Sequence, residues 1–197
     1  MMRTAIVLAG LCLMMLKPAR ADEFTAKELN LYAGTGASLS NRHGRSTFHS
    51  VTFELMSDSK HLVRWLPNSD AGLSLSYSDV LQPRSWFGND GDPNDHVRSE
   101  WLFAFARYHF LRLRSSEMFV ELGTGPMWGN RRIPAATSRF NFHSQFGVGT
   151  VLFRESSHPL RLIGHFSHAS NAGTASRNPG LNIFSWSVGT TVGRRRP

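Results

Sequence analysis

Cysteine is almost absent from this chain of 197 residues, in which Cys12 is the only one. A single cysteine excludes a disulfide framework within the chain and a cysteine-based metal site. Long apolar runs are missing as well. The apolar run Ala5–Leu16 is twelve residues long, whereas a membrane-spanning helix needs about 18 to 20. The sequence therefore predicts no transmembrane helix.

The N-terminus has the pattern of an export signal. Arg3 supplies a positive charge, Ala5–Leu16 supplies an apolar core, and the tripeptide Ala19–Ala21 fits a small-x-small cleavage site. The alternative, a membrane-anchoring helix, is disfavoured because the apolar run is short. We expect residues 1–21 to be a signal peptide and residues 22–197 to form one domain.

Acidic residues are scarce: 14 Asp and Glu stand against 22 Lys and Arg, for a net charge of +8. Removal of Arg3, Lys17 and Arg20 with the signal leaves a charge of +5. This balance indicates an anionic partner. Nucleic acid is the usual one, but an exported protein rarely meets it, so we expect an anionic membrane surface and no nucleic acid.

Helix signals are also few, and the mature chain instead alternates polar and apolar residues in short segments. Gly, Pro, Asn, Asp and Ser separate these segments, as expected for strands. The eight predicted strands are 28–38, 47–57, 71–80, 98–110, 118–127, 140–153, 160–170 and 183–193.

The faces of these strands differ in polarity. In 183–193, for example, Phe184 and Trp186 share a face opposite Ser185 and Ser187. Such alternation over about ten residues is typical of an outer-membrane β-barrel. A soluble antiparallel barrel or sandwich can show the same pattern.

The lengths of the connections favour the membrane barrel. With both termini in the periplasm, four loops face outside and three turns face the periplasm, and outer loops are expected to be longer. The predicted loops are 39–46, 81–97, 128–139 and 171–182, and the turns are 58–70, 111–117 and 154–159. The turn 58–70 is too long, which suggests a misplaced boundary.

The chain ends in Arg194–Pro197 where such barrels often end in an aromatic residue, and we interpret this segment as a tail beyond the last strand. The predicted fold class is all-β, an eight-stranded antiparallel transmembrane β-barrel of the bacterial outer membrane.

The strand 160–170 carries a candidate catalytic pair. His168 and Ser170 are two residues apart, so in a strand they share a face and lie about 7 Å apart at the backbone. Their side chains could close that gap to the hydrogen bond that serine nucleophiles use. The face also carries Leu162 and Phe166, which predicts that the pair faces lipid at the outer end of the strand.

An unpaired polar group that faces lipid is costly, so a reactive role is an economical explanation for His168 and Ser170. A second pair, His165 and Ser167, lies on the opposite face. The segments Asn171-Ala172-Gly173 and Asn178-Pro179-Gly180-Leu181-Asn182, which follow His168 and Ser170, select the first pair.

The segment from Leu160 to Trp186 resembles the outer-membrane lipid A 3-O-deacylases of the PagL type. The resemblance is carried by His168-x-Ser170-Asn171-Ala172-Gly173 and by Asn178-Pro179-Gly180-x-Asn182. Over the rest of the mature chain the similarity is only architectural.

The resemblance implies a role for each matched position. Ser170 would attack an ester carbonyl, and His168 would take its proton and return it to the leaving alcohol. Gly173, through its backbone N–H, and Asn178, through its side-chain amide, would stabilise the oxyanion. Asn171 would hold the turn or add a further donor.

Asn182 departs from the family pattern, in which the matching position is often acidic and orients the histidine. Replacing the acid of a serine protease triad by its amide costs about 10⁴ in rate, although papain-like enzymes work with asparagine. We expect Asn182 to orient His168 in an active enzyme. A distant carboxylate, such as Asp79 or Glu100, is the alternative if the barrel brings it near.

The implied substrate is lipid A, the implied bond is the ester of the 3-hydroxyacyl chain at position 3, and no cofactor or metal is needed. Two other functions stay open from the residues alone. One is an outer-membrane phospholipase or general esterase, and the other is a non-catalytic small barrel. Family members can also pair as homodimers, for which no residue pattern in this chain argues.

Overall fold

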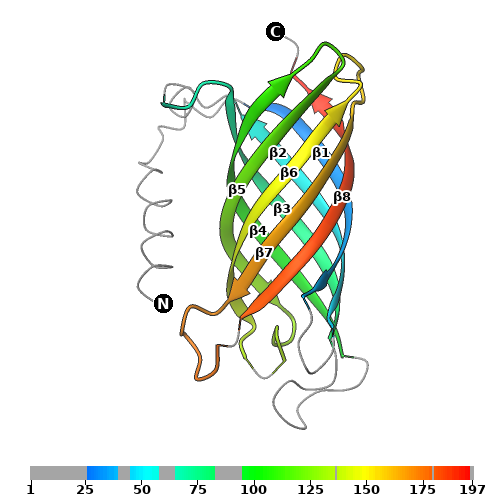
Figure 1. The fold of residues 1–197 in the computed structure, drawn as a ribbon. Coiled ribbons are helices and arrows are strands. Elements are labelled where there is room, and N and C mark those ends of the chain that lie inside the picture. The colour runs from blue at the N-terminus through cyan, green and yellow to red at the C-terminus, as the bar shows by residue number, and fades with distance from the viewer. Residues whose placement is uncertain are drawn as a thin grey trace.

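The computed structural model describes residues 26–39, 45–57, 65–82, 95–135, 137–178 and 180–195. Eight antiparallel strands form a closed barrel in which neighbours in sequence pair and β1 also pairs with β8 (Figure 1). The predicted fold is confirmed. The strands are β1 (Ala26–Ser38), β2 (Thr47–Ser57), β3 (Ser69–Gln82), β4 (Asp95–Arg112), β5 (Ser116–Gly129), β6 (Phe140–Leu152), β7 (Leu160–Ser170) and β8 (Leu181–Arg194).

The observed strand boundaries lie close to the predicted ones. β2 and β7 begin and end at the predicted residues, and every other strand does so to within three residues. The connection between β2 and β3 runs over 58–68, because β3 begins at Ser69, two residues before its predicted start; the suspected boundary error is thus small and the connection stays long. The predicted tail is shorter than expected, because Arg194 belongs to β8. The predicted signal peptide, Cys12, Pro179 and residues 196–197 lie outside the described residues.

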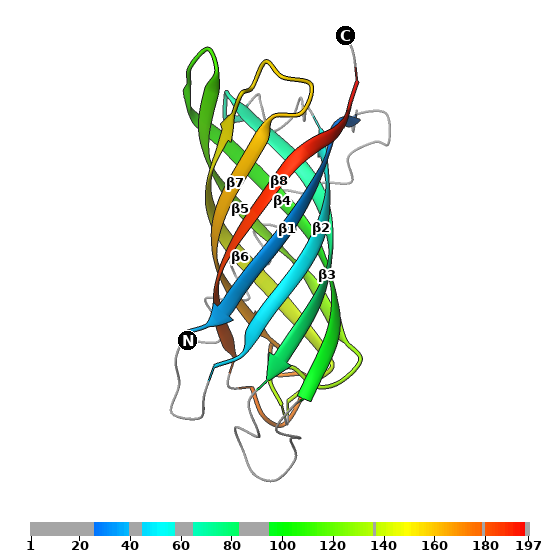
Figure 2. The ribbon, with the colours of Figure 1, turned by 90° about the vertical axis from the view of Figure 1, so that its right-hand side faces the viewer.

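The connections sort to the two ends of the barrel as predicted. Figures 1 and 2 show the connection between β7 and β8 at the end opposite to the start of β1 and the end of β8. We call the end with the connections 39–46, 83–94, 130–139 and 171–180 the loop end, and the other the terminal end. Among the described residues, no helix is long and apolar enough to cross a membrane.

The outer surface of the barrel is apolar along its strands. Large side chains stand exposed on it, including Leu75, Leu122, Phe166 and Trp186. Trp128 is exposed as well, whereas Trp101 is 8% exposed and packs inside the barrel. An apolar outer face along the strands is the arrangement that fits a barrel in hydrocarbon.

The loop end of the interior is filled by an apolar plug, whose residues come from β2, β3, β4, β5, β7 and β8 and from the connection between β5 and β6. Its members are Phe48, Val80, Val97, Trp101, Phe103, Met127, Ile133, Ala169, Leu181 and Ile183. Ala169, Leu181 and Ile183 belong to this plug, so it backs the loop ends of β7 and β8 from inside the barrel.

The middle of the interior holds an ionic layer around Arg107, whose side chain is fully buried. Its guanidinium donates to Glu54 Oε2 at 2.8 Å and to Glu121 Oε2 at 2.6 Å. Asn30 donates to Glu54 at 2.8 Å, and His165 lies 2.7 Å from Glu121. Each buried charge thus has an opposite charge and further hydrogen bonds, the condition under which buried ions are tolerated.

Candidate active site

The two predicted catalytic residues, His168 and Ser170, stand on the outer face of β7 at its loop end. His168 is exposed and Ser170 is half-buried, whereas Ala169 between them is fully buried in the apolar plug. Side chains alternate between the two faces of a strand, so His168 and Ser170 point outward and Ala169 points inward. The predicted face is therefore confirmed, and the buried Ala169 holds the strand that carries both side chains.

Asn182 lies directly across from His168, because the two residues are register partners in β7 and β8. Its side-chain Oδ1 is 2.7 Å from His168 Nδ1. An amide oxygen can only accept, so in this orientation Nδ1 carries the proton and Nε2 keeps a lone pair. That is the form of the ring that can act as a base toward a hydroxyl.

Gly180 packs against the imidazole ring of His168, a contact that the sequence reasoning did not find. Its φ is +68°, a conformation that favours glycine. A Cβ added to Gly180 would lie 2.6 Å from Cε1 of His168. Glycine at this position therefore lets the loop turn and leaves room for the ring beside Asn182.

Asn171 is fully buried and holds the loop that follows β7. Its amide Nδ2 donates to the carbonyl of Arg177 at 2.7 Å, and its Oδ1 accepts the backbone N–H of Gly173 at 2.9 Å. Its own N–H donates to Asn178 Oδ1 at 3.1 Å. Of the two roles considered for Asn171, the geometry matches the turn, since its amide is already engaged.

The two candidate oxyanion donors are placed differently. The Gly173 N–H is directed to Asn171 Oδ1. Asn178 is fixed through its Oδ1, which leaves its amide N–H₂ without a partner among the described residues. Asn178 is thus the more available donor.

His168 and Ser170 share their face but form no hydrogen bond in the part of the chain that the structure describes. Catalytic hydrogen bonds are often long before substrate binds. The competing pair points the other way: His165 and Ser167 face the interior, where His165 contacts Glu121 at 2.7 Å. That pair therefore does not reach the outer surface.

The distant carboxylates do not replace Asn182. Asp79 lies on β3, where it contacts His96 at 3.4 Å, and Glu100 lies on β4. The strands paired with β7 are β6 and β8, whose residues opposite His168 are Ser144 and Asn182. The alternative that the barrel brings either acid to His168 is wrong, because β3 and β4 are not neighbours of β7.

The described residues contain no group of three or more His, Cys, Asp or Glu side chains that could hold a metal ion. The side chains of the site offer the hydroxyl of Ser170, the imidazole of His168 and the amides of Asn178 and Asn182.

Solved structures share the fold. The chain is similar to one titled "Crystal structure of the outer membrane enzyme PagL", with a TM-score of 0.56 and 15% identity over 81% of this chain and 97% of that chain. It is also similar to "Crystal structure of Neisserial surface protein A (NspA)", with a TM-score of 0.56 and 10% identity over 85% of this chain and 98% of that chain.

A search of curated proteins gives no match. The family model described as "Lipid A 3-O-deacylase (PagL)" matches residues 50–191. This range is most of the chain and contains His168, Ser170 and Asn182. The chain therefore belongs to the PagL family of lipid A 3-O-deacylases.

Proposed function

We propose that the protein is an outer-membrane lipid A 3-O-deacylase that works by a serine–histidine mechanism. Family membership supports the activity. The observation that carries the mechanism is the 2.7 Å contact between His168 Nδ1 and Asn182 Oδ1 on the face that also carries Ser170. It prepares the imidazole as a base next to a hydroxyl, as nucleophilic catalysis by serine requires.

The proposed orientation places the loop end outside the cell and both termini in the periplasm. Outer-membrane barrels have longer loops outside and shorter turns in the periplasm. His168 and Ser170 are among the last three residues of β7 before the loop end. In this orientation they lie level with the outer leaflet, where lipid A resides, and they face it directly.

The reaction begins with attack of Ser170 Oγ on the carbonyl carbon of the 3-hydroxyacyl ester at position 3. His168 Nε2 takes the hydroxyl proton and then gives it to the departing sugar oxygen. An acyl-enzyme remains on Ser170, and water, activated by His168, releases the 3-hydroxy fatty acid. The other product is 3-O-deacylated lipid A. Each step uses groups of the chain and one water molecule, without a metal or cofactor.

The tetrahedral intermediate carries a negative oxygen that needs hydrogen-bond donors. The side-chain amide of Asn178 supplies one, since Asn171 fixes its other end. The Gly173 N–H supplies a second once it turns from Asn171 Oδ1 to the oxyanion. One such donor is worth about 10² to 10³ in kcat.

Mass spectrometry of lipid A tests the proposal. Cells that make the wild-type chain should contain lipid A lacking one 3-hydroxyacyl group. The loss should vanish in Ser170→Ala and in His168→Ala, with heat-modifiable gel migration to show that each barrel is folded. Ser167→Ala, on the inner face, is the matched control and should keep the activity. An unaltered lipid A profile with folded wild-type protein would refute the proposal, and hydrolysis of a simple phospholipid would favour a general esterase.

A further inference from the structure

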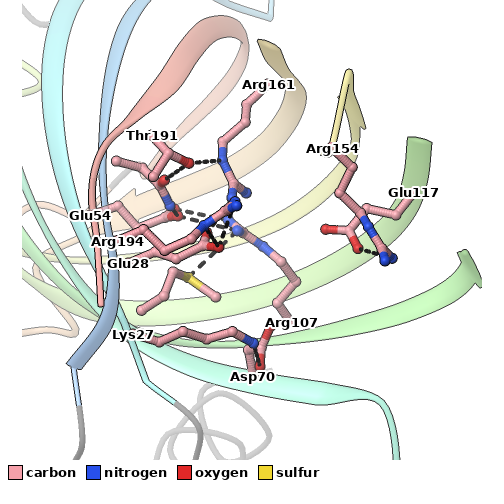
Figure 3. Close-up of polar contacts among 12 residues, drawn as sticks. Lys27, Glu28, Glu54, Asp70, Arg107, Glu117, Arg154, Arg161, Thr191 and Arg194 are labelled. Atoms are coloured by element: carbon pink, nitrogen blue, oxygen red, sulfur yellow. Dashed lines mark hydrogen bonds and ion pairs between the residues drawn. The ribbon is translucent and has the colours of Figure 1, made fainter. Parts of the chain in front are cut away.

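A large cavity opens into the barrel at the terminal end, far along β7 from the catalytic pair. Its volume is about 810 Å³. Of its fourteen lining residues, seven are Lys or Arg and four are Asp or Glu. Figure 3 shows part of this lining: Arg107 of β4, Arg161 of β7 and Arg194 of β8 converge beside Glu28 and Glu54, and Lys27 of β1 lies beside Asp70. We call this cavity the terminal vestibule.

The cations at the floor of the vestibule are already matched by carboxylates. Arg107 is held between Glu54 and Glu121. Arg161 donates to Glu28, as Arg194 also does at 3.0 Å (Figure 3). The hydrogen bonds of these arginines are short, as in complete ion pairs. Their donors are therefore already used by carboxylates and are not available to a ligand.

The wall near the turn between β6 and β7 is different, because one carboxylate there faces two guanidinium groups. Arg112 Nε and Arg154 Nη1 both lie 3.6 Å from Glu117 Oε2, beyond hydrogen-bond distance. Each arginine side chain is 40% exposed. Neither side chain has a hydrogen-bond acceptor among the described residues, so their donors stay available from the vestibule.

A buried histidine behind this wall also has an unused nitrogen. His109 is 5% exposed, and its Nε2 is bound to Asp70 Oδ2 at 2.9 Å. Its Nδ1 has no hydrogen-bond partner, although Glu117 Oε1 lies 3.4 Å away. Glu117 is thus shared by three basic groups and forms a hydrogen bond with none of them.

From this arrangement we propose that the terminal vestibule binds a phosphate group between Arg112 and Arg154. Both nitrogens lie 3.6 Å from the same oxygen, so their separation cannot exceed twice that distance. A phosphate accepts several charge-assisted hydrogen bonds of about 2.8 Å and matches the planar fork of arginine.

The phosphate can come from solution or from the headgroup of a phospholipid in the adjoining leaflet. Both sources present the same doubly or singly charged oxyanion to the same two arginines. The site is separate from His168 and Ser170, so it does not depend on the proposed deacylase activity.

Calorimetric titration of the folded chain in maltoside micelles with pyrophosphate tests the proposal. Saturable binding at one site is expected for wild type. Arg112→Gln and Arg154→Gln should each weaken it about tenfold or more, because each variant removes charge-assisted hydrogen bonds to the phosphate. Arg114→Gln is the matched control, because Arg114 lies in the neighbouring turn, is 90% exposed and does not line the vestibule.

A gain of affinity provides the second, independent test. Glu117→Gln removes the competing carboxylate and should tighten binding about tenfold, whereas Glu155→Gln, whose carboxylate is 65% exposed, should change it little. If Glu117→Gln and Glu155→Gln changed the affinity for pyrophosphate equally, net charge alone would explain the binding and the proposed site would be wrong. The same conclusion would follow from equal effects of Arg112→Gln and Arg114→Gln. Absence of binding by wild type would overturn it as well.

Vesicles distinguish the two sources. If phosphatidylglycerol, compared with phosphatidylcholine, weakens pyrophosphate binding in wild type but not in Arg112→Gln, a headgroup reaches the site. If neither lipid changes the affinity for pyrophosphate, the ligand is free phosphate. Either outcome is consistent with a phosphate site between Arg112 and Arg154.

Discussion

Asn182 Oδ1 lies 2.7 Å from His168 Nδ1, across a directly paired position of β7 and β8. An amide in this position has one accepting and one donating end, whereas a carboxylate accepts at both oxygens. The orientation of the Asn182 amide therefore decides which tautomer His168 adopts, and this one contact governs the expected behaviour of the site.

Asn182→Asp should leave deacylase activity unchanged or lower it, because the amide oxygen already accepts from Nδ1 and a carboxylate on the lipid-facing surface costs desolvation. Asn182→Leu should lower kcat by about 10² to 10⁴, since nothing then selects the tautomer. Lipid A deacylation by purified protein in micelles measures both. Much higher activity in Asn182→Asp would show instead that the amide is a handicap.

Gly180→Ala should lower kcat about tenfold or more with little change in KM. The new Cβ would meet the His168 ring at 2.6 Å and displace it, while the +68° φ adds strain. Ala172→Gly, at another residue of this loop with positive φ, is the control and should keep its activity. Equal kcat values for Gly180→Ala and wild type would contradict the role of Gly180 as a positioning residue.

Asn171→Ala should loosen the loop over 172–178, because it removes the two hydrogen bonds that the Asn171 side chain makes to the loop. We expect trypsin to cut after the exposed Arg177 about tenfold faster than in wild type. Trypsin should digest Asn171→Asp at a rate between those of wild type and Asn171→Ala. A carboxylate at this position can accept from Gly173 N–H but cannot donate to the Arg177 carbonyl. Identical digestion of all three proteins would argue against this role.

Arg107→Met should destabilise the folded barrel by about 3 to 5 kcal/mol, because it leaves Glu54 and Glu121 buried without their common partner. Urea unfolding in micelles, followed by gel migration, measures the change. Adding Glu54→Gln and Glu121→Gln to Arg107→Met should restore much of the loss. If the triple variant were no more stable than the single one, the cost would not come from unpaired charge.

The sequence predicted the secondary structure and the faces of the site well, because both follow from a local period of two. His168 and Ser170 point outward and Ala169 inward for that reason alone. The same local pattern placed His165 and Ser167 on the inner face.

Contacts between strands were harder to foresee. Asp79 and Glu100 were candidates for orienting His168, yet β3 and β4 do not pair with β7. The ring contact of Gly180 and the engaged amide of Asn171 depend on the path of the loop after β7, for which the sequence offered only turn residues.

By itself, then, the sequence determined an eight-stranded barrel, its apolar exterior and a histidine–serine pair on that exterior, since alternation along a strand needs no knowledge of its neighbours. Only the tertiary structure decided that Asn182 meets His168, that Arg107 meets Glu54 from 53 residues away, and that Arg112 and Arg154 share Glu117. The physical reason is that register and barrel closure set these distances, and both are properties of paired strands rather than of any one segment.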